Sequence, residues 1–165
     1  LRSNHWAEQN LKKEAEKRGI KKDRLVFANI LPQEEHLARY KHADLFMDTF
    51  NVNAHTTTSD ALWAGLPVVT KLGQGFVSRV AGSLLSAVGM PELITKSNEE
   101  YEALILDLAT NPKKLNKIKE KLVANRLLKP LFDTELFTKH LEDGYQKAYQ
   151  TYCDGNSIQN IFVSD

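Results

Sequence analysis

Cysteine is nearly absent from this chain: its 165 residues include a single one, Cys153. One cysteine cannot form a disulfide within the chain, so the cysteine content does not indicate an oxidising compartment. The sequence also has no recognisable signal peptide and no apolar run long enough to cross a membrane. We therefore expect a cytoplasmic protein that does not bind a membrane.

An excess of charge of one sign is also lacking. The 22 Lys and Arg residues nearly balance the 21 Asp and Glu residues, which leaves a net charge of +1, and the lysines alternate with acidic residues. We expect no general attraction to nucleic acid. No pair of acidic residues is spaced to hold Mg²⁺, so we expect no metal. The remaining composition, 42% hydrophobic and 26% charged, is typical of a globular domain with its own core.

Hydroxyl groups are concentrated in Thr56, Thr57 and Thr58, between a strand expected near residues 44–49 and a buried strand at 67–70. Strand, polar turn, short helix and strand form a βαβ unit. The first turn of a helix has N–H groups without partners and a partial positive charge, which favour an anion such as phosphate. His55 adds an imidazole, and Asp60 is one turn further, within reach of sugar hydroxyls. The pattern indicates a nucleotide diphosphate, although a simple helix cap explains the threonines equally well.

The rest of the sequence continues the α/β pattern. We expect further strands at 24–27 and 92–95, and helices at 4–18, from Pro32, at 78–88, from Ser97, from Pro112 and at 134–152. These elements predict a Rossmann-like parallel sheet flanked by helices, with a helical C-terminus. The last helix should bury a stripe made of Phe137, Leu141, Tyr145, Ala148 and Tyr152. We expect residues 1–152 to form one partial domain and residues 153–165 a flexible tail.

The segment His55-Thr56-Thr57, followed by Asp60 and by residues 62–70, resembles the nucleotide-binding signature of the protein O-linked N-acetylglucosamine transferases, the family that also includes the plant SPINDLY proteins. The likeness continues over roughly residues 24–150 in the family's order and spacing. The further segments that carry it are 24–27, 32–39, 43–49, 78–80, 92–94, 100–101 and 130–132.

This resemblance implies the truncated second, donor-binding domain of a GT-B glycosyltransferase. In that family a first Rossmann-like half and a run of tetratricopeptide repeats precede this domain, and we expect both as parts of the parent chain. The sequence contains no repeat of tetratricopeptide length itself and begins at Leu1 rather than Met. Other active-site residues of the family, including a phosphate-binding lysine, lie upstream. We therefore assign no catalytic residue here and expect the isolated fragment to be inactive.

The resemblance also implies roles for individual residues and a reaction. The donor would be UDP-N-acetylglucosamine, and the sugar would pass to Ser or Thr hydroxyls of an acceptor protein. The resemblance implies no cofactor beyond this sugar donor. The implied contacts are His55, Thr56 and Thr57 for the diphosphate, Asp60 for the ribose, and Leu31, Gln33, His36 and Arg39 for the base. Gln33 stands where the animal enzymes have a lysine, so one positive charge is missing.

Other interpretations stay open from the sequence. SPINDLY-type relatives use GDP-fucose, although the combination of His55 and Asp60 favours the acetylglucosamine type. The chain also fits a non-catalytic α/β module that binds a nucleotide or a partner protein. Because His36 and Arg39 are three residues apart they share a helix face, yet a solvent-facing histidine and an arginine paired with Glu35 would give the same pattern.

Overall fold

The computed structural model describes residues 4–163 and separates into two compact units, Leu1–Arg39 and Tyr40–Asp165. The first unit is helical. Its helix α1 (His5–Lys17) begins after Asn4, whose Oδ1 accepts a hydrogen bond from the Ala7 N–H at 2.8 Å. The helix ends before Gly19, which has a φ of +77° that glycine adopts without steric cost. A short 3₁₀ turn, η1 (Lys22–Arg24), and a short helix, α2 (Gln33–Ala38), complete the unit.

The prediction of a strand at residues 24–27 is wrong. Arg24 closes the η1 turn, and the residues that follow run without regular structure, with Val26 88% exposed. A strand needs a neighbouring strand to satisfy its backbone groups. Among the described residues the sheet consists of three strands, none of which pairs with this segment. Three apolar residues in a row, Leu25, Val26 and Phe27, therefore did not suffice to make a strand here.

The second unit is built on a parallel sheet whose strand order is β1-β2-β3. The strands are β1 (Phe46–Met47), β2 (Val68–Lys71) and β3 (Ile94–Thr95), so β2 is central. Phe46 lies opposite Val68, and Thr70 lies opposite Ile94. The expected βαβ unit and Rossmann-like parallel sheet are confirmed, with β1 and β3 shorter than the sequence pattern suggested.

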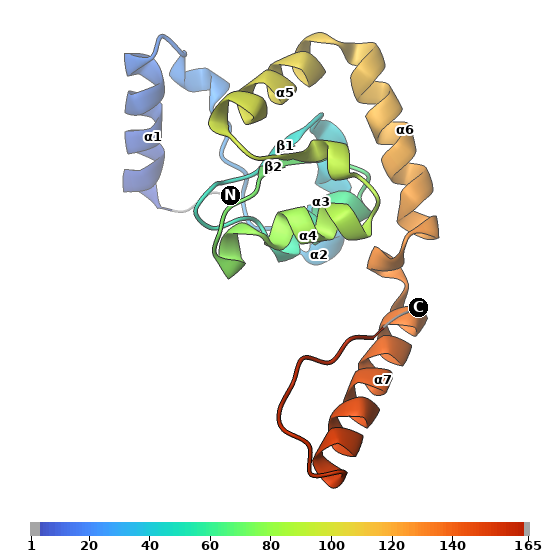
Figure 1. The fold of residues 1–165 in the computed structure, drawn as a ribbon. Helices are drawn as coiled ribbons and strands as arrows, with labels where there is room; N and C mark the ends of the chain where they lie inside the picture. Colours follow the sequence, from blue (N-terminus) through green and yellow to red (C-terminus); the bar gives the residue numbers. More distant parts are fainter. Residues whose placement is uncertain (1–3, 164–165) are drawn as a thin grey trace. The chain divides into compact units, whose positions relative to one another are not determined.

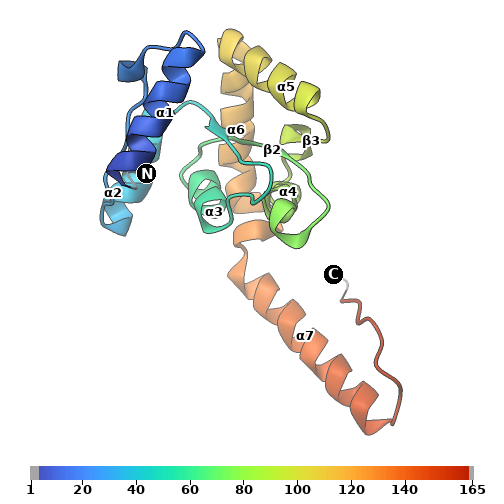
Figure 2. The same ribbon diagram turned by 90° about the vertical axis from the view of Figure 1, so that its left-hand side faces the viewer.

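Helices cover this sheet on both sides. The βαβ crossover helix α3 (Thr56–Trp63) and α4 (Val80–Ala87) lie on one side of the strands, and α5 (Asn98–Thr110) lies on the other (Figures 1 and 2). A longer helix, α6 (Pro112–Leu128), packs against α3 and α5. Three 3₁₀ turns connect these elements: η3 (Phe76–Ser78), η4 (Pro91–Leu93) and η5 (Pro130–Phe132). The 3₁₀ turn η2 (Arg39–His42) leads into the unit.

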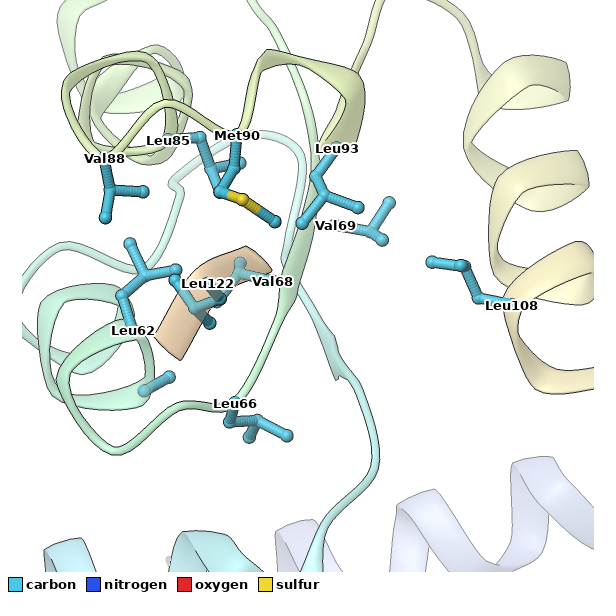
Figure 3. Close-up of a cluster of buried hydrophobic side chains, with 11 residues drawn as sticks. Leu62, Leu66, Val68, Val69, Leu85, Val88, Met90, Leu93, Leu108 and Leu122 are labelled. Atoms are coloured by element: carbon cyan, nitrogen blue, oxygen red, sulfur yellow. The ribbon is translucent and has the colours of Figure 1, made fainter. Parts of the chain in front are cut away.

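The core forms on both faces of β2. Consecutive strand residues point to opposite faces, and Val68 and Val69 are both fully buried. Figure 3 shows Val68 beside Leu62 and Leu122, and Val69 on the side of Leu108 from α5. Burial on both faces is characteristic of a parallel strand between helical layers. The buried apolar cluster comprises Ala61, Leu62, Leu66, Val68, Val69, Leu85, Val88, Met90, Leu93, Leu108 and Leu122.

The last helix, α7 (Thr134–Cys153), extends away from the sheet (Figure 1), and the expectation that its apolar stripe is buried is wrong. Phe137 is 64% exposed, Tyr145 67% and Tyr152 81%. Helical periodicity reveals that such a stripe exists but not which surface covers it. The residues after α7 fold back along it, and Lys147 Nζ donates to the Phe162 carbonyl at 2.9 Å. A flexible tail from residue 153 and a domain end at residue 152 stay predictions.

Helix α5 offers a matched test of the core. Leu108 is 1% exposed and Leu106 is 56% exposed on the same helix. We expect Leu108→Ala to lower the free energy of unfolding by about 2–5 kcal/mol because it leaves a cavity beside β2. Leu106→Ala should change it by less than about 0.5 kcal/mol. Urea unfolding of both variants measures the difference, and equal losses would contradict this description of the core.

Candidate functional site

The candidate site lies where the parallel strands end. Open α/β sheets bind ligands beyond the carboxyl ends of their strands. The segment that follows β1 leads within nine residues to Thr56, the first residue of α3. The turn at His55, Thr56 and Thr57 therefore belongs to this edge of the sheet, where the sequence predicted it.

The first turn of α3 keeps its backbone donors. His55 occupies the N-cap position, and its side chain makes no capping hydrogen bond. Thr58 is buried, and its hydroxyl donates back to the Ala54 carbonyl at 2.8 Å, so it does not cap the helix. Within the described residues no acceptor is recorded for the N–H groups of Thr56 and Thr57. The simple-cap interpretation of the threonines is therefore wrong, and the turn retains donors suited to an anion.

The imidazole of His55 is held in one orientation. Its Nε2 lies 3.2 Å from the carbonyl oxygen of Val77, which also accepts a hydrogen bond from the Asn53 N–H at 2.8 Å. A carbonyl oxygen can only accept, so Nε2 carries the proton and Nδ1 is the other hydrogen-bonding atom of the ring. The ring also packs edge-on against Phe76, with the centroids 6.3 Å apart. Segment 76–78 therefore fixes the direction in which His55 presents Nδ1.

Asp60, the predicted ribose contact, lies on α3 three residues after Thr57. Positions three apart share a helix face, so the carboxylate follows the threonine turn on the same side of the helix. Asp60 is partly buried. The structure thus brings together His55, Thr56, Thr57 and Asp60 on one helix of the second unit.

The predicted base-binding residues belong to the first unit, where two of them touch. Arg39 Nη2 lies 2.5 Å from His36 Nδ1, and Arg39 Nη1 donates to the Asn29 carbonyl at 2.7 Å. A guanidinium can only donate, so Nδ1 of His36 accepts and its proton is on Nε2. Leu31 is 37% exposed, and Gln33 is exposed at the start of α2. Contact between His36 and Arg39 is established, whereas base binding by these residues stays a prediction.

Sequence reasoning missed a buried carboxylate beside the turn. Asp48 follows β1 and is 4% exposed, and its backbone carbonyl accepts a hydrogen bond from the Tyr101 hydroxyl at 2.8 Å. Its side chain accepts from Thr70 Oγ1 at 2.6 Å and from the Ala54 N–H at 2.7 Å. Burial, and secondly the charge of Asp48, raise the pKa of Tyr101 above its ordinary value. The available signal was an acidic residue at the carboxyl end of a strand expected to be buried.

A cavity of about 530 Å³ lies near the same edge of the sheet. Its lining is mainly apolar and includes Leu72, Phe76, Arg79, Ser83 and Ile94. Phe76 both lines this cavity and makes the ring contact with His55.

Over residues 4–163, no group of three His, Cys, Asp or Glu residues is arranged to hold a metal ion. In the same part of the chain no helix combines the length and apolarity needed to span a bilayer.

Comparison with models of protein families identifies the family of this chain. A model of glycosyl transferase family 41 matches residues 1–141. The chain belongs to glycosyl transferase family 41. The resemblance to the O-linked N-acetylglucosamine transferase and SPINDLY proteins, noted from the motifs, is thereby confirmed.

Several proteins with assigned names are similar to the chain over most of its length. A probable UDP-N-acetylglucosamine–peptide N-acetylglucosaminyltransferase, SEC, from Arabidopsis thaliana is 40% identical over 146 residues, which are 88% of this chain and 15% of that protein. A UDP-N-acetylglucosamine–peptide N-acetylglucosaminyltransferase from Caenorhabditis elegans is 35% identical over 161 residues, 98% of this chain and 14% of that protein. The chain therefore spans only a small part of the length of these curated relatives.

A solved structure extends the likeness from sequence to fold. A mutant of the O-GlcNAc transferase from Thermobaculum terrenum superposes with a TM-score of 0.86 at 31% sequence identity, and the match covers 92% of this chain and 29% of that chain. The short parallel sheet with flanking helices is thus the fold of part of a family 41 protein. This match agrees with the expected GT-B type.

The contact between Tyr101 and Asp48 at the carboxyl end of β1 can be tested through its pH dependence. Because its pKa is raised, the unfolded chain loses the phenolic proton first, so this contribution to stability is complete below about pH 10 and is lost as pH rises through the folded-state pKa. We expect the stability gap between the wild type and Tyr101→Phe to narrow above about pH 10 in urea unfolding. Tyr145→Phe, at a 67% exposed position, serves as the control for removing a phenolic hydroxyl from the surface. A constant gap for Tyr101→Phe would contradict the raised pKa of Tyr101.

Proposed function

We propose that this chain is the donor-binding part of a glycosyltransferase that binds UDP-N-acetylglucosamine and serves transfer of N-acetylglucosamine to Ser or Thr hydroxyls of proteins. The observation that carries the proposal is the uncapped first turn of α3, with the N–H groups of Thr56 and Thr57 available at the carboxyl edge of the sheet. The names of the Arabidopsis and Caenorhabditis relatives support the choice of donor and of a peptide acceptor. A cytoplasmic location and an upstream catalytic half belong to the same proposal.

The proposed mechanism uses these residues to stabilise the leaving group. As the glycosidic bond breaks, negative charge grows on the diphosphate of UDP. The Thr56 and Thr57 amides and hydroxyls are donors whose directions are set by α3. The Val77 carbonyl orients the His55 ring, whose Nδ1 would be a further donor only in the doubly protonated imidazolium. Donors fixed in advance toward developing charge contribute roughly 2.7–4 kcal/mol each in well-studied enzymes. With such donors the proposal requires no metal and no cofactor, and Asp60 is assigned to the ribose hydroxyls.

Calorimetric titration with UDP, GDP and inorganic pyrophosphate tests the diphosphate turn. We expect UDP to bind more tightly than GDP, and the double substitution Thr56→Val/Thr57→Val to weaken UDP and pyrophosphate alike by at least about tenfold, because hydroxyl bonds to a charged acceptor are lost. Thr138→Val on α7 is the matched control, since that hydroxyl donates only to the Thr134 carbonyl, at 2.8 Å. Tighter binding of GDP would refute the donor assignment and favour a SPINDLY-like sugar donor. If the wild type binds none of the three, either the missing strands of the domain or a non-catalytic role explains the result, and titration of the full-length parent separates these two.

Pyrophosphate also separates nucleoside contacts from phosphate contacts, because it has neither ribose nor base. If His36 and Asp60 contact the nucleoside, then His36→Gln and Asp60→Asn should each weaken UDP and leave pyrophosphate unchanged. Glu34→Gln, an exposed change on the same helix as His36, should alter neither affinity. Equal losses for both ligands in His36→Gln would show that the substitution acts on something other than base recognition.

A further inference from the structure

Asp48 makes more contacts than the end of a strand requires. Its Oδ1 accepts hydrogen bonds from the Thr49 N–H at 2.8 Å and from the Ala54 N–H at 2.7 Å, and its Oδ2 accepts from Thr70 Oγ1 at 2.6 Å. The loop between β1 and His55 consists of residues 48–54, so Thr49 lies at its start and Ala54 at its end. One carboxylate therefore closes both ends of this loop and ties it to the central strand β2.

We propose that Asp48 is a positioning residue that holds the first turn of α3 in its anion-binding geometry. The inference rests on the proposed function, because it assigns to Asp48 the support of the diphosphate turn. Asp48 does not itself face the ligand, since it is 4% exposed and its oxygens are engaged within the protein. Removing a carboxylate from water is costly unless hydrogen bonds replace the lost hydration. Three short hydrogen bonds do so here, and two of them come from the backbone of the loop.

The path from Asp48 to the turn is continuous. Ala54 donates its N–H to Asp48, and its carbonyl accepts from Thr58 Oγ1 at 2.8 Å. Thr58 is fully buried in α3 beside the threonines that offer donors. Ala54 is thus fixed on one side to β2 through Asp48 and Thr70, and on the other side to α3. Displacement of Ala54 would carry His55 and the Thr56 N–H with it.

The loop has no regular secondary structure. Apart from Asp48, it is also held from outside by the Asn53 N–H bond to the Val77 carbonyl at 2.8 Å and by the edge-on packing of Phe50 on Tyr101, with ring centroids 5.0 Å apart. Within it, the Thr49 hydroxyl donates to the Val52 carbonyl at 2.5 Å, and Asn53 Nδ2 donates to the Thr49 carbonyl at 2.7 Å. Both bonds start or end at Thr49, which is itself anchored by Asp48. An ordered loop lowers the cost of ligand binding, because the conformational entropy is lost during folding rather than during binding. Asp48 therefore contributes to affinity through the loop.

The binding test compares Asp48→Ala with Asp48→Asn, using UDP and pyrophosphate as calorimetric probes. We expect Asp48→Ala to weaken both ligands by about tenfold or more, because the turn loses its support. Asp48→Asn should restore most of the affinity, since its amide oxygen still accepts from Thr49 and Ala54 and its NH₂ group can donate to Thr70. Asp44→Ala, at an 84% exposed carboxylate before β1, is the matched control and should bind as the wild type does. Wild-type affinity in a folded Asp48→Ala variant would overturn the proposal.

Hydrogen exchange without ligand separates this inference from the proposed function. We expect the amides of Thr58 and Ser59, which donate to the His55 carbonyl at 3.1 Å, to exchange faster in Asp48→Ala than in the wild type, with little change at Leu122 in α6. If Asp48→Ala does not fold, Thr70→Val removes only the bond to Oδ2 and should give a smaller acceleration at the same amides. Unchanged exchange at Thr58 and Ser59 would overturn the positioning role. A wild type that binds neither probe would count against the proposed function, while local acceleration would still support the role of Asp48 in holding the turn.

Discussion

The backbone groups of β2 can be satisfied only by a strand on each side, because helices cover both of its faces and leave no room for water. Val68 and Val69 point to opposite faces and are both fully buried. Each end of the strand uses a different neighbour: Phe46 and Met47 pair with its first half, and Ile94 and Thr95 pair with its second half. An unpaired buried N–H or carbonyl costs as much as a lost hydrogen bond. The need to pair the backbone of β2 therefore determines where β1 and β3 lie in the second unit.

The place of the candidate site follows from the same arrangement. Two adjacent parallel strands cannot be joined by a tight turn, so the chain must return from the end of β1 to the start of β2 through a crossover, which is α3. The helix consequently begins near the carboxyl edge, where its unpartnered N–H groups and partial positive charge are directed toward the ligand side of the sheet. The turn back into β2 needs a glycine at position 65, because its φ is +82°. The same turn ends α3: the N–H of the next residue, Leu66, donates to the Ala61 carbonyl at 2.8 Å.

The sequence predicted those parts of the molecule that depend on local pattern. Strand β2, helix α3 and the cap of α5, where Ser97 Oγ accepts from the Glu100 N–H at 3.1 Å, all lie where pattern and capping residues placed them. Residues 24–27 and the stripe of α7 failed because strand pairing and helix burial depend on partners that a local pattern does not name. Asp48 was missed for a similar reason. Its partners Thr70, at the carboxylate, and Tyr101, at the backbone carbonyl, are 22 and 53 residues away in the sequence, and only folding brings them to this one residue.

The three consecutive threonines illustrate why composition alone left the site ambiguous. Successive residues of an α-helix are separated by about 100°, so three in a row cannot all face one ligand. Thr58 shares the inward face with Ala61 and Leu62, three and four residues later, and all three are fully buried. A buried hydroxyl needs a partner, which the Ala54 carbonyl provides. The inward threonine thus joins the helix to the loop that Asp48 closes, and this leaves Thr56 and Thr57 on the outward part of the turn with their donors available.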